Sequence, residues 1–69
     1  MPITMANTGE KLTVKNILGK SDVKKFLESL GFVKEAEVLV VSKVMGNLII
    51  SVKSTRIAID KDMAKCIMV

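Results

Sequence analysis

Histidine, tryptophan and tyrosine are absent from this chain of 69 residues, and cysteine occurs once, at Cys66. Without histidine the chain lacks the most common general base and metal ligand of proteins. A lone cysteine forms no intramolecular disulfide, and without histidine it cannot complete a structural zinc site. We therefore expect a protein that is not an enzyme, holds no cofactor or metal ion, and does not depend on an oxidising compartment.

Aromatic residues are scarce as well, because Phe26 and Phe32 are the only two. The chain is nevertheless basic, with a net charge of +4 and a single arginine, Arg56. Modules that bind single-stranded nucleic acid stack bases on aromatic side chains, so this chain could hold a duplex only through its phosphates. We expect no nucleic-acid binding, and interpret the lysine-rich surface as solvated or as steering the protein toward an acidic partner.

Long hydrophobic runs are missing too. The longest uncharged runs cover residues 1–9 and 44–52, about half of the ~18–20 residues that a membrane-spanning helix needs. The start of the chain lacks the basic segment and long apolar core of a signal peptide. We therefore expect a cytoplasmic location, no membrane span and, at this length, one small domain over residues 1–69.

One segment has the apolar spacing of a helix. Its apolar residues recur at i, i+3, i+4 and i+7, namely Val23, Phe26, Leu27 and Leu30, which predicts an α-helix from about Ser21 to Leu30. Ser21 is the expected N-cap. Gly31 follows the last apolar position, as a helix-ending glycine does. Phe32 and Val33 are then expected to fold back on the helix end.

The rest of the chain favours short strands separated by turns. Alternating or doubly apolar segments predict strands over residues 11–17, 37–44, 48–52, 56–59 and 66–69. In the second of these, Val38, Val40 and Val44 are expected to share one face. Residues 1–10 are expected to form a short edge strand or an extended arm. Asp60 is the expected cap of a short turn over residues 61–64, and Cys66 is expected in the core.

The edge strands of a small antiparallel sheet expose unpaired backbone groups. In so small a chain the sheet protects them by curving toward a closed barrel. The order of the predicted elements therefore indicates a mainly β fold. We expect a small, partly open barrel of about five strands, with the single helix covering one end. The function of such a barrel resides in its loops and its open sheet edge.

Several segments taken together resemble the FeoA family of small ferrous iron transport proteins. The similar segments are residues 26–33 with their Leu-Gly-Phe, the Val-rich residues 38–41, residues 46–50, residues 56–59, Ala64 with residues 67–69, and Val14 to Gly19 upstream. The resemblance covers nearly the whole chain. It implies an SH3-like β-barrel with an inserted helix. It also implies a non-enzymatic cytoplasmic accessory of the FeoB ferrous iron transporter, docking on its cytoplasmic GTPase portion and modulating transport.

The resemblance gives no list of contact residues, but two regions are candidates for partner binding. They are the helix end with its following loop, and two basic strand positions: Leu30, Gly31, Phe32, Val33, Lys34, Lys53 and Arg56. The family usually has a glycine in the loop after Leu-Gly-Phe, whereas this chain has Glu35 and Ala36 there. If that backbone needs a positive φ, a residue other than glycine costs about 1 kcal/mol.

Three alternatives stay open at this level. A small basic barrel could bind nucleic acid or another protein partner, and a salt-dependent association with duplex would indicate the former. The chain could also be the sensor half of a regulator, since the same barrel type appears fused to metal-dependent repressors. The apolar strands also leave room for a homo-oligomer formed through a sheet edge.

Overall fold

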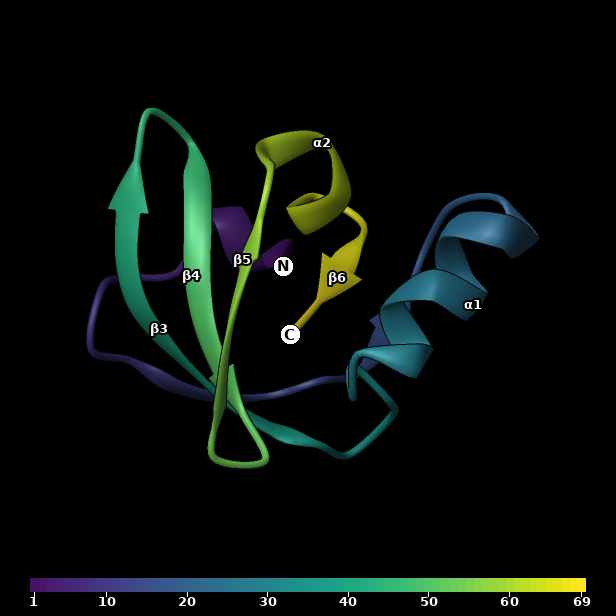
Figure 1. Cartoon of the computed structure of the whole chain (residues 1–69), viewed down its shortest axis with the longest axis horizontal. Coiled ribbons are helices and arrows are strands. Elements are labelled where there is room, and N and C mark those ends of the chain that lie inside the picture. The colour runs from purple at the N-terminus through teal and green to yellow at the C-terminus, as the bar shows by residue number, and fades with distance from the viewer.

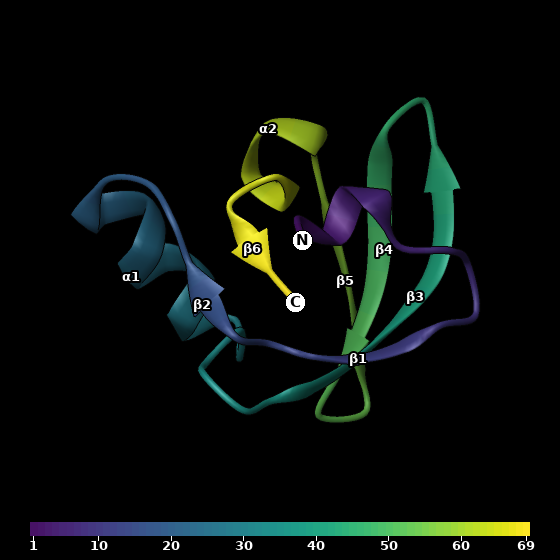
Figure 2. The ribbon, with the colours of Figure 1, turned by 180° about the vertical axis from the view of Figure 1, so that it is seen from behind.

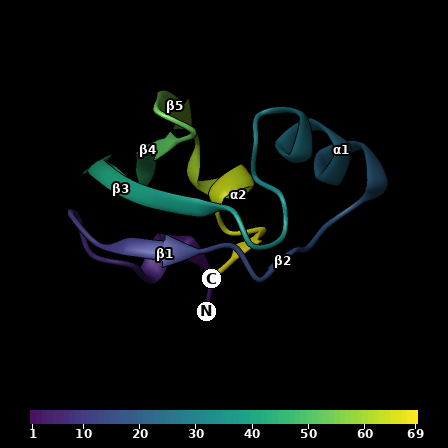
Figure 3. The same ribbon diagram turned by 90° about the horizontal axis from the view of Figure 1, so that it is seen from below.

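A computed structural model describes residues 1–69 (Figure 1). The elements along the chain are η1 (Ile3–Met5), β1 (Lys11–Thr13), β2 (Asn16–Ile17), α1 (Ser21–Ser29), β3 (Glu37–Val44), β4 (Asn47–Val52), β5 (Thr55–Ile59), α2 (Lys61–Ala64) and β6 (Ile67–Met68). One antiparallel sheet has the order β1-β3-β4-β5, and β2 pairs with β6 in a second sheet. The larger sheet curls around α2 and the small pair (Figure 3). This confirms the predicted mainly β fold, although the two sheets do not join into a closed barrel.

The predicted strand over residues 11–17 is divided between the two sheets, which is why six strands are present instead of five. Val14 marks the division. Its N–H donates to Ala36 O and its carbonyl accepts from Glu35 N–H, at 2.9 and 2.8 Å. The N–H of the next residue, Lys15, already donates to Met68 O in β6. The strand therefore changes partners at Val14 while staying extended (Figure 2), a change that alternation of side chains does not reveal.

The prediction of an edge strand or extended arm at the N-terminus was wrong for residues 3–5, which form one turn of 3-10 helix. Ala6 N–H donates to Ile3 O at 3.0 Å. The i to i+3 spacing of this turn places Ile3 and Ala6 on the same side, and both are fully buried. Met5, the residue before Ala6, is exposed.

The core lies between the two sheets and the helices and consists of apolar residues only. It comprises Ile3, Ala6, Val14, Ile17, Leu27, Phe32, Val38, Val40, Leu48, Ile50, Val52, Ile59, Ala64, Ile67 and Val69. Cys66, expected in the core, lies at its margin and is partly buried. The prediction that Val44 shares a face with Val38 and Val40 was wrong, because the register shifts between Val40 and Ser42. That irregularity inserts a residue and moves Val44 to the outside.

Helix α1 ends one residue before the predicted limit and stands to one side of the sheets (Figures 1 and 3). Leu27 is its fully buried residue, while Phe26, expected on the same face, is 50% exposed at the edge of that face. The predicted cap at Ser21 was wrong. Lys20 occupies the N-cap position and no side chain caps the helix. No helix in this structure is long and apolar enough to cross a membrane.

The predicted cap at Asp60 is confirmed, because its Oδ1 accepts a hydrogen bond from Met63 N–H at 2.8 Å. This bond holds the single turn of α2, which brings the buried Ala64 against the core.

Replacing Asp60 by alanine is expected to lower the free energy of unfolding by about 1 kcal/mol, the usual value of an N-cap. Urea unfolding of the two proteins measures the difference. The matched control is Asp62→Ala, which removes an exposed 3.9 Å ion pair with Lys65 and an acidic side chain of the first turn, and should change stability by about 0.5 kcal/mol or less. Equal losses in the two variants would contradict the capping role.

Candidate functional site

The end of α1 is fixed by a Schellman motif, which also fixes where the candidate binding loop begins. Gly31 N–H donates to Glu28 O at 3.0 Å and Phe32 N–H donates to Leu27 O at 3.1 Å. Gly31 has a φ of +108°, a conformation that glycine adopts without strain. The motif folds Phe32 back toward the helix end, as predicted, and Phe32 and Leu27 are both fully buried. Val33, which was also expected to fold back, is exposed instead.

The same glycine lets the helix end approach the turn between β4 and β5. A Cβ at Gly31 would lie 3.4 Å from Val52 Cγ2 and 3.8 Å from Lys53 Cδ. The two candidate regions that the sequence places some twenty residues apart, residues 30–34 and Lys53, are therefore neighbours in the structure. Both lie at the lower end of the molecule in Figure 1.

The loop after Phe32 closes in a turn over residues 33–36. Ala36 N–H donates to Val33 O at 3.0 Å, and Glu35, the third residue of the turn, has a φ of +75°. A positive φ at that position is the mark of a type II turn, which normally requires glycine or asparagine there. The loop thus keeps the backbone that glycine favours, although this chain has a glutamate.

Replacing Glu35 by glycine is expected to raise the free energy of unfolding by about 1 kcal/mol, because it relieves the left-handed strain of a residue with a Cβ. Thermal unfolding of the variant measures this. Lys34→Gly, one position earlier and without a positive φ, is the matched control and should destabilise. A fall in stability for Glu35→Gly would mean that the glutamate side chain contributes more than its backbone strain costs.

The turn between β4 and β5 carries the same kind of strain. Val52 pairs with Thr55, and the two residues between them, Lys53 and Ser54, have φ values of +51° and +64°. This is a type I′ turn, whose usual residues are asparagine and glycine. Neither of these two residues is a glycine, so the turn is strained. Lys53 therefore lies at the tip of a tight, strained hairpin.

We call the exposed part of this end the basal face and define it as Val33, Lys34, Lys53, Ser54 and Arg56. All five are exposed, Val33 at 37%. The only ion pair in the structure joins Lys65 and Asp62, so the three cations of the basal face are unpaired. The buried Phe32 and Gly31 and the half-buried Leu30 shape this face from behind.

Arg56 lies on a different side of the hairpin from the helix end. It pairs with Ser51, and Ser51 pairs with Leu39 across the sheet. Since paired residues share a face and neighbours along a strand alternate, Arg56 points to the outer side while Val52 points into the core. Lys53 thus lies between the helix-end loop and the outer side of the sheet.

A shallow groove of about 330 Å³ runs along that outer side. Its lining residues are Lys11, Glu37, Val38, Leu39, Ser51, Lys53 and Ser54. Of these, the sequence had indicated only Lys53 as a candidate. The others come together through the pairing of β1 with β3 and of β3 with β4, which strand patterns alone do not specify. Elsewhere, no group of three Cys, Asp or Glu side chains is placed to hold a metal ion.

Comparison with known proteins identifies the family. The family model of the FeoA domain matches residues 1–69, while no curated protein sequence matches the chain. The chain is 37% identical to an iron uptake regulatory protein, FeoA, of known crystal structure, with a TM-score of 0.89, covering 97% of this chain and 89% of the other. It is 28% identical to Stenotrophomonas maltophilia FeoA, an SH3 domain protein crystallised with zinc, with a TM-score of 0.86, covering 99% and 87%.

Proteins outside this family share the fold. A manganese-dependent transcriptional repressor shares it at 16% identity and a TM-score of 0.88, over 97% of this chain and 39% of the repressor. That likeness concerns the fold alone. The match over every residue of the chain, and the similarity to solved FeoA structures over nearly its whole length, establish that this chain belongs to the FeoA family of ferrous iron transport proteins.

Proposed function

We propose that this chain is a cytoplasmic, non-enzymatic accessory protein of ferrous iron uptake that docks on the cytoplasmic GTPase portion of the FeoB transporter and modulates transport. Membership of the FeoA family supports the connection with ferrous iron transport. The basal face is the surface on which we place the contact, through Val33, Lys34, Lys53 and Arg56, with Leu30, Gly31 and Phe32 holding the loop in position.

The observation that carries this placement is that strain and unpaired charge coincide. Three of the four residues other than glycine that have a positive φ, Glu35, Lys53 and Ser54, lie at this end of the molecule. Such conformations cost of order 1 kcal/mol each or more and tend to occur at functional sites. The cations of the same face have no partner within the chain. The strained backbone at these positions lowers the stability of the fold, and it fixes the shape of the exposed basic surface.

The chemistry of the face points to an acidic protein surface as its complement. Lys34 and Lys53 present two positive charges at the same end as the exposed Val33, and Arg56 adds a third on the outer side of the hairpin. Opposite charges on the partner would steer the encounter and fix its orientation. The tight turns fix the backbone that carries Lys34 and Lys53 before the partner arrives, so less backbone freedom is lost on binding.

A charge reversal tests the placement. The double variant Lys34→Glu and Lys53→Glu is expected to weaken binding to the soluble cytoplasmic domain of FeoB by about tenfold or more, measured by calorimetry. The control reverses two exposed lysines on α1, Lys24→Glu and Lys25→Glu, giving the same net charge and little loss of affinity. Equal losses would show that only net charge matters. Binding to a short DNA duplex that is stronger than binding to the FeoB domain would favour the nucleic-acid alternative.

A further inference from the structure

The hairpin between β3 and β4 ends in a second exposed feature, at the opposite end of the molecule from the basal face (Figure 1). Val44 is 62% exposed and Met45 is 93% exposed. We call these two residues the hairpin tip. Neither belongs to the core, and Met45 is the most exposed large apolar side chain of the molecule.

The backbone at the hairpin tip is also strained. Val44 pairs with Asn47, and the residues between them, Met45 and Gly46, both have a positive φ, +54° for Met45. A type I′ turn favours asparagine or glycine at its first central position. Methionine there is strained and also exposed, so neither the local backbone nor the packing accounts for this side chain.

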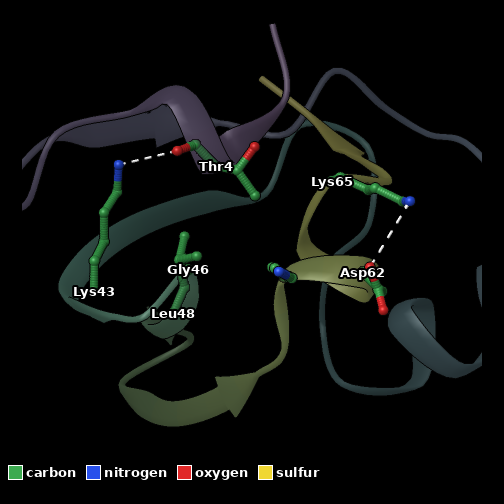
Figure 4. Close-up of a pocket in the computed structure, with 7 residues that line it drawn as sticks. Thr4, Lys43, Gly46, Leu48, Asp62 and Lys65 are labelled. Atoms are coloured by element: carbon green, nitrogen blue, oxygen red, sulfur yellow. Dashed lines mark hydrogen bonds and ion pairs between the residues drawn. The ribbon is translucent and has the colours of Figure 1, made fainter.

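Three lysines surround a pocket directly beside the tip (Figure 4). The pocket measures about 330 Å³ and is lined by Thr4, Lys43, Gly46, Leu48, Lys61, Asp62 and Lys65. Lys43 Nζ donates to Thr4 O at 3.0 Å. The Lys61 stem covers Gly46, where an added Cβ would lie 3.2 Å from Lys61 Cδ. Lys65 lies 3.9 Å from Asp62, the single carboxylate among the three cations.

We infer that the hairpin tip is a membrane-docking element, which inserts Val44 and Met45 among anionic phospholipid headgroups while Lys43, Lys61 and Lys65 contact the phosphates. An apolar tip next to a group of lysines is the combination that holds peripheral proteins on anionic bilayers. Charge complementarity therefore favours an anionic lipid surface as the partner. We place a lipid phosphate in the pocket beside the tip, which Lys43 and Lys61 both line.

A protein partner fits this end less well. Protein interfaces concentrate their binding energy in Trp, Tyr and Arg. Arg56, the single residue of these types in the chain, belongs to the basal face and does not line the pocket beside the tip. Carboxylates are recognised best by the planar fork of arginine, whereas lysines act as mobile point charges, which suits a fluid array of phosphates. This inference goes beyond the proposed contact with FeoB and does not depend on it, because the two surfaces lie at opposite ends and both can be occupied together.

Sedimentation with vesicles tests the inference. The full chain is mixed with vesicles of phosphatidylcholine, either pure or containing one quarter phosphatidylglycerol, at low salt and millimolar lipid. Binding to the anionic vesicles alone is expected, and it should weaken as salt rises. The double variant Lys61→Gln and Lys65→Gln should bind about 30-fold more weakly, from the usual contribution of lysines near a charged bilayer. Lys24→Gln with Lys25→Gln on α1 is the control of equal charge.

A second variant distinguishes loss of the apolar contact with the membrane from loss of folding. Met45→Asn places a residue suited to the turn at the tip, so the protein stays folded, and it should weaken binding about tenfold through loss of the inserted side chain. Three results would overturn the inference: no binding to anionic vesicles by the folded protein, equal losses in the α1 control, or full binding by Met45→Asn. Amide shifts at residues 44–46 on adding the FeoB domain, with none on adding vesicles, would assign the tip to a protein partner instead.

Discussion

Replacing Phe32 by alanine is expected to lower the free energy of unfolding by about 3–5 kcal/mol, the usual cost of removing a buried aromatic ring. Phe32 is the largest fully buried side chain of the molecule. It also holds the helix end, since its N–H donates to Leu27 O while its ring packs in the same core. A chain of this length has a total stability of roughly 3–10 kcal/mol, so the variant should be largely unfolded.

The other phenylalanine is the control. Phe26 is 50% exposed on α1, so Phe26→Ala should cost about 1 kcal/mol or less. Urea unfolding followed by far-UV circular dichroism compares the two variants with the parent. Similar losses for both would contradict the assignment of Phe32 to the core and Phe26 to its edge.

The double variant Lys53→Asn and Ser54→Gly is expected to be more stable than the parent and weaker in docking. Both positions have left-handed backbone, and Asn-Gly is the preferred pair of a type I′ turn. Relief of strain at two positions should raise the free energy of unfolding by about 1–2 kcal/mol. Loss of the Lys53 charge should weaken binding to the FeoB domain by about tenfold.

The single variant Ser54→Gly separates these effects, because it relieves part of the strain and keeps Lys53. It should gain about half the stability and bind as the parent does. Thermal unfolding and calorimetric titration are made on the same preparations. A double variant that is stabilised and still binds fully would remove Lys53 from the contact. One that is destabilised would contradict the strain at this turn.

Much of the fold could be predicted because its signals are local. The helix from Ser21 rests on four apolar residues at helical spacing, and the strand over residues 37–44 rests on the apolar run of residues 38–41. Both elements match the structure closely. The Asp60 cap and the glycine that ends α1 are also signals of one or two residues, and both are confirmed.

Most of the incorrect predictions concern residues whose hydrogen-bonding partners lie far away in the sequence. Val14 turns the first strand toward β6 because residues 35 and 36 take its hydrogen bonds, and nothing near Val14 in sequence indicates this. The irregularity after Val40 reverses which residues of β3 face the core, so Val44 could not be placed by alternation. At the N-terminus, spacing alone did not separate one 3-10 turn from a strand.

The candidate site was predictable as two separate regions and not as one surface. Gly31 was recognised as the end of the helix, but its close approach to Lys53 depends on how α1 packs beside the hairpin. The missing glycine at Glu35 did give a local signal, and the structure retains the positive φ there. Phe32, a candidate by position, is buried and acts through the shape of the loop.

The most direct test of the proposed function is a titration of the isotope-labelled chain with the soluble cytoplasmic GTPase domain of FeoB, followed by amide chemical shifts. If the basal face is the contact, the shifts should concentrate at residues 33–35 and 53–56 and saturate with the added domain. Shifts confined to other parts of the chain would contradict the placement of the contact. A spectrum unchanged by the domain, from a chain that remains folded, would contradict docking on this part of the transporter.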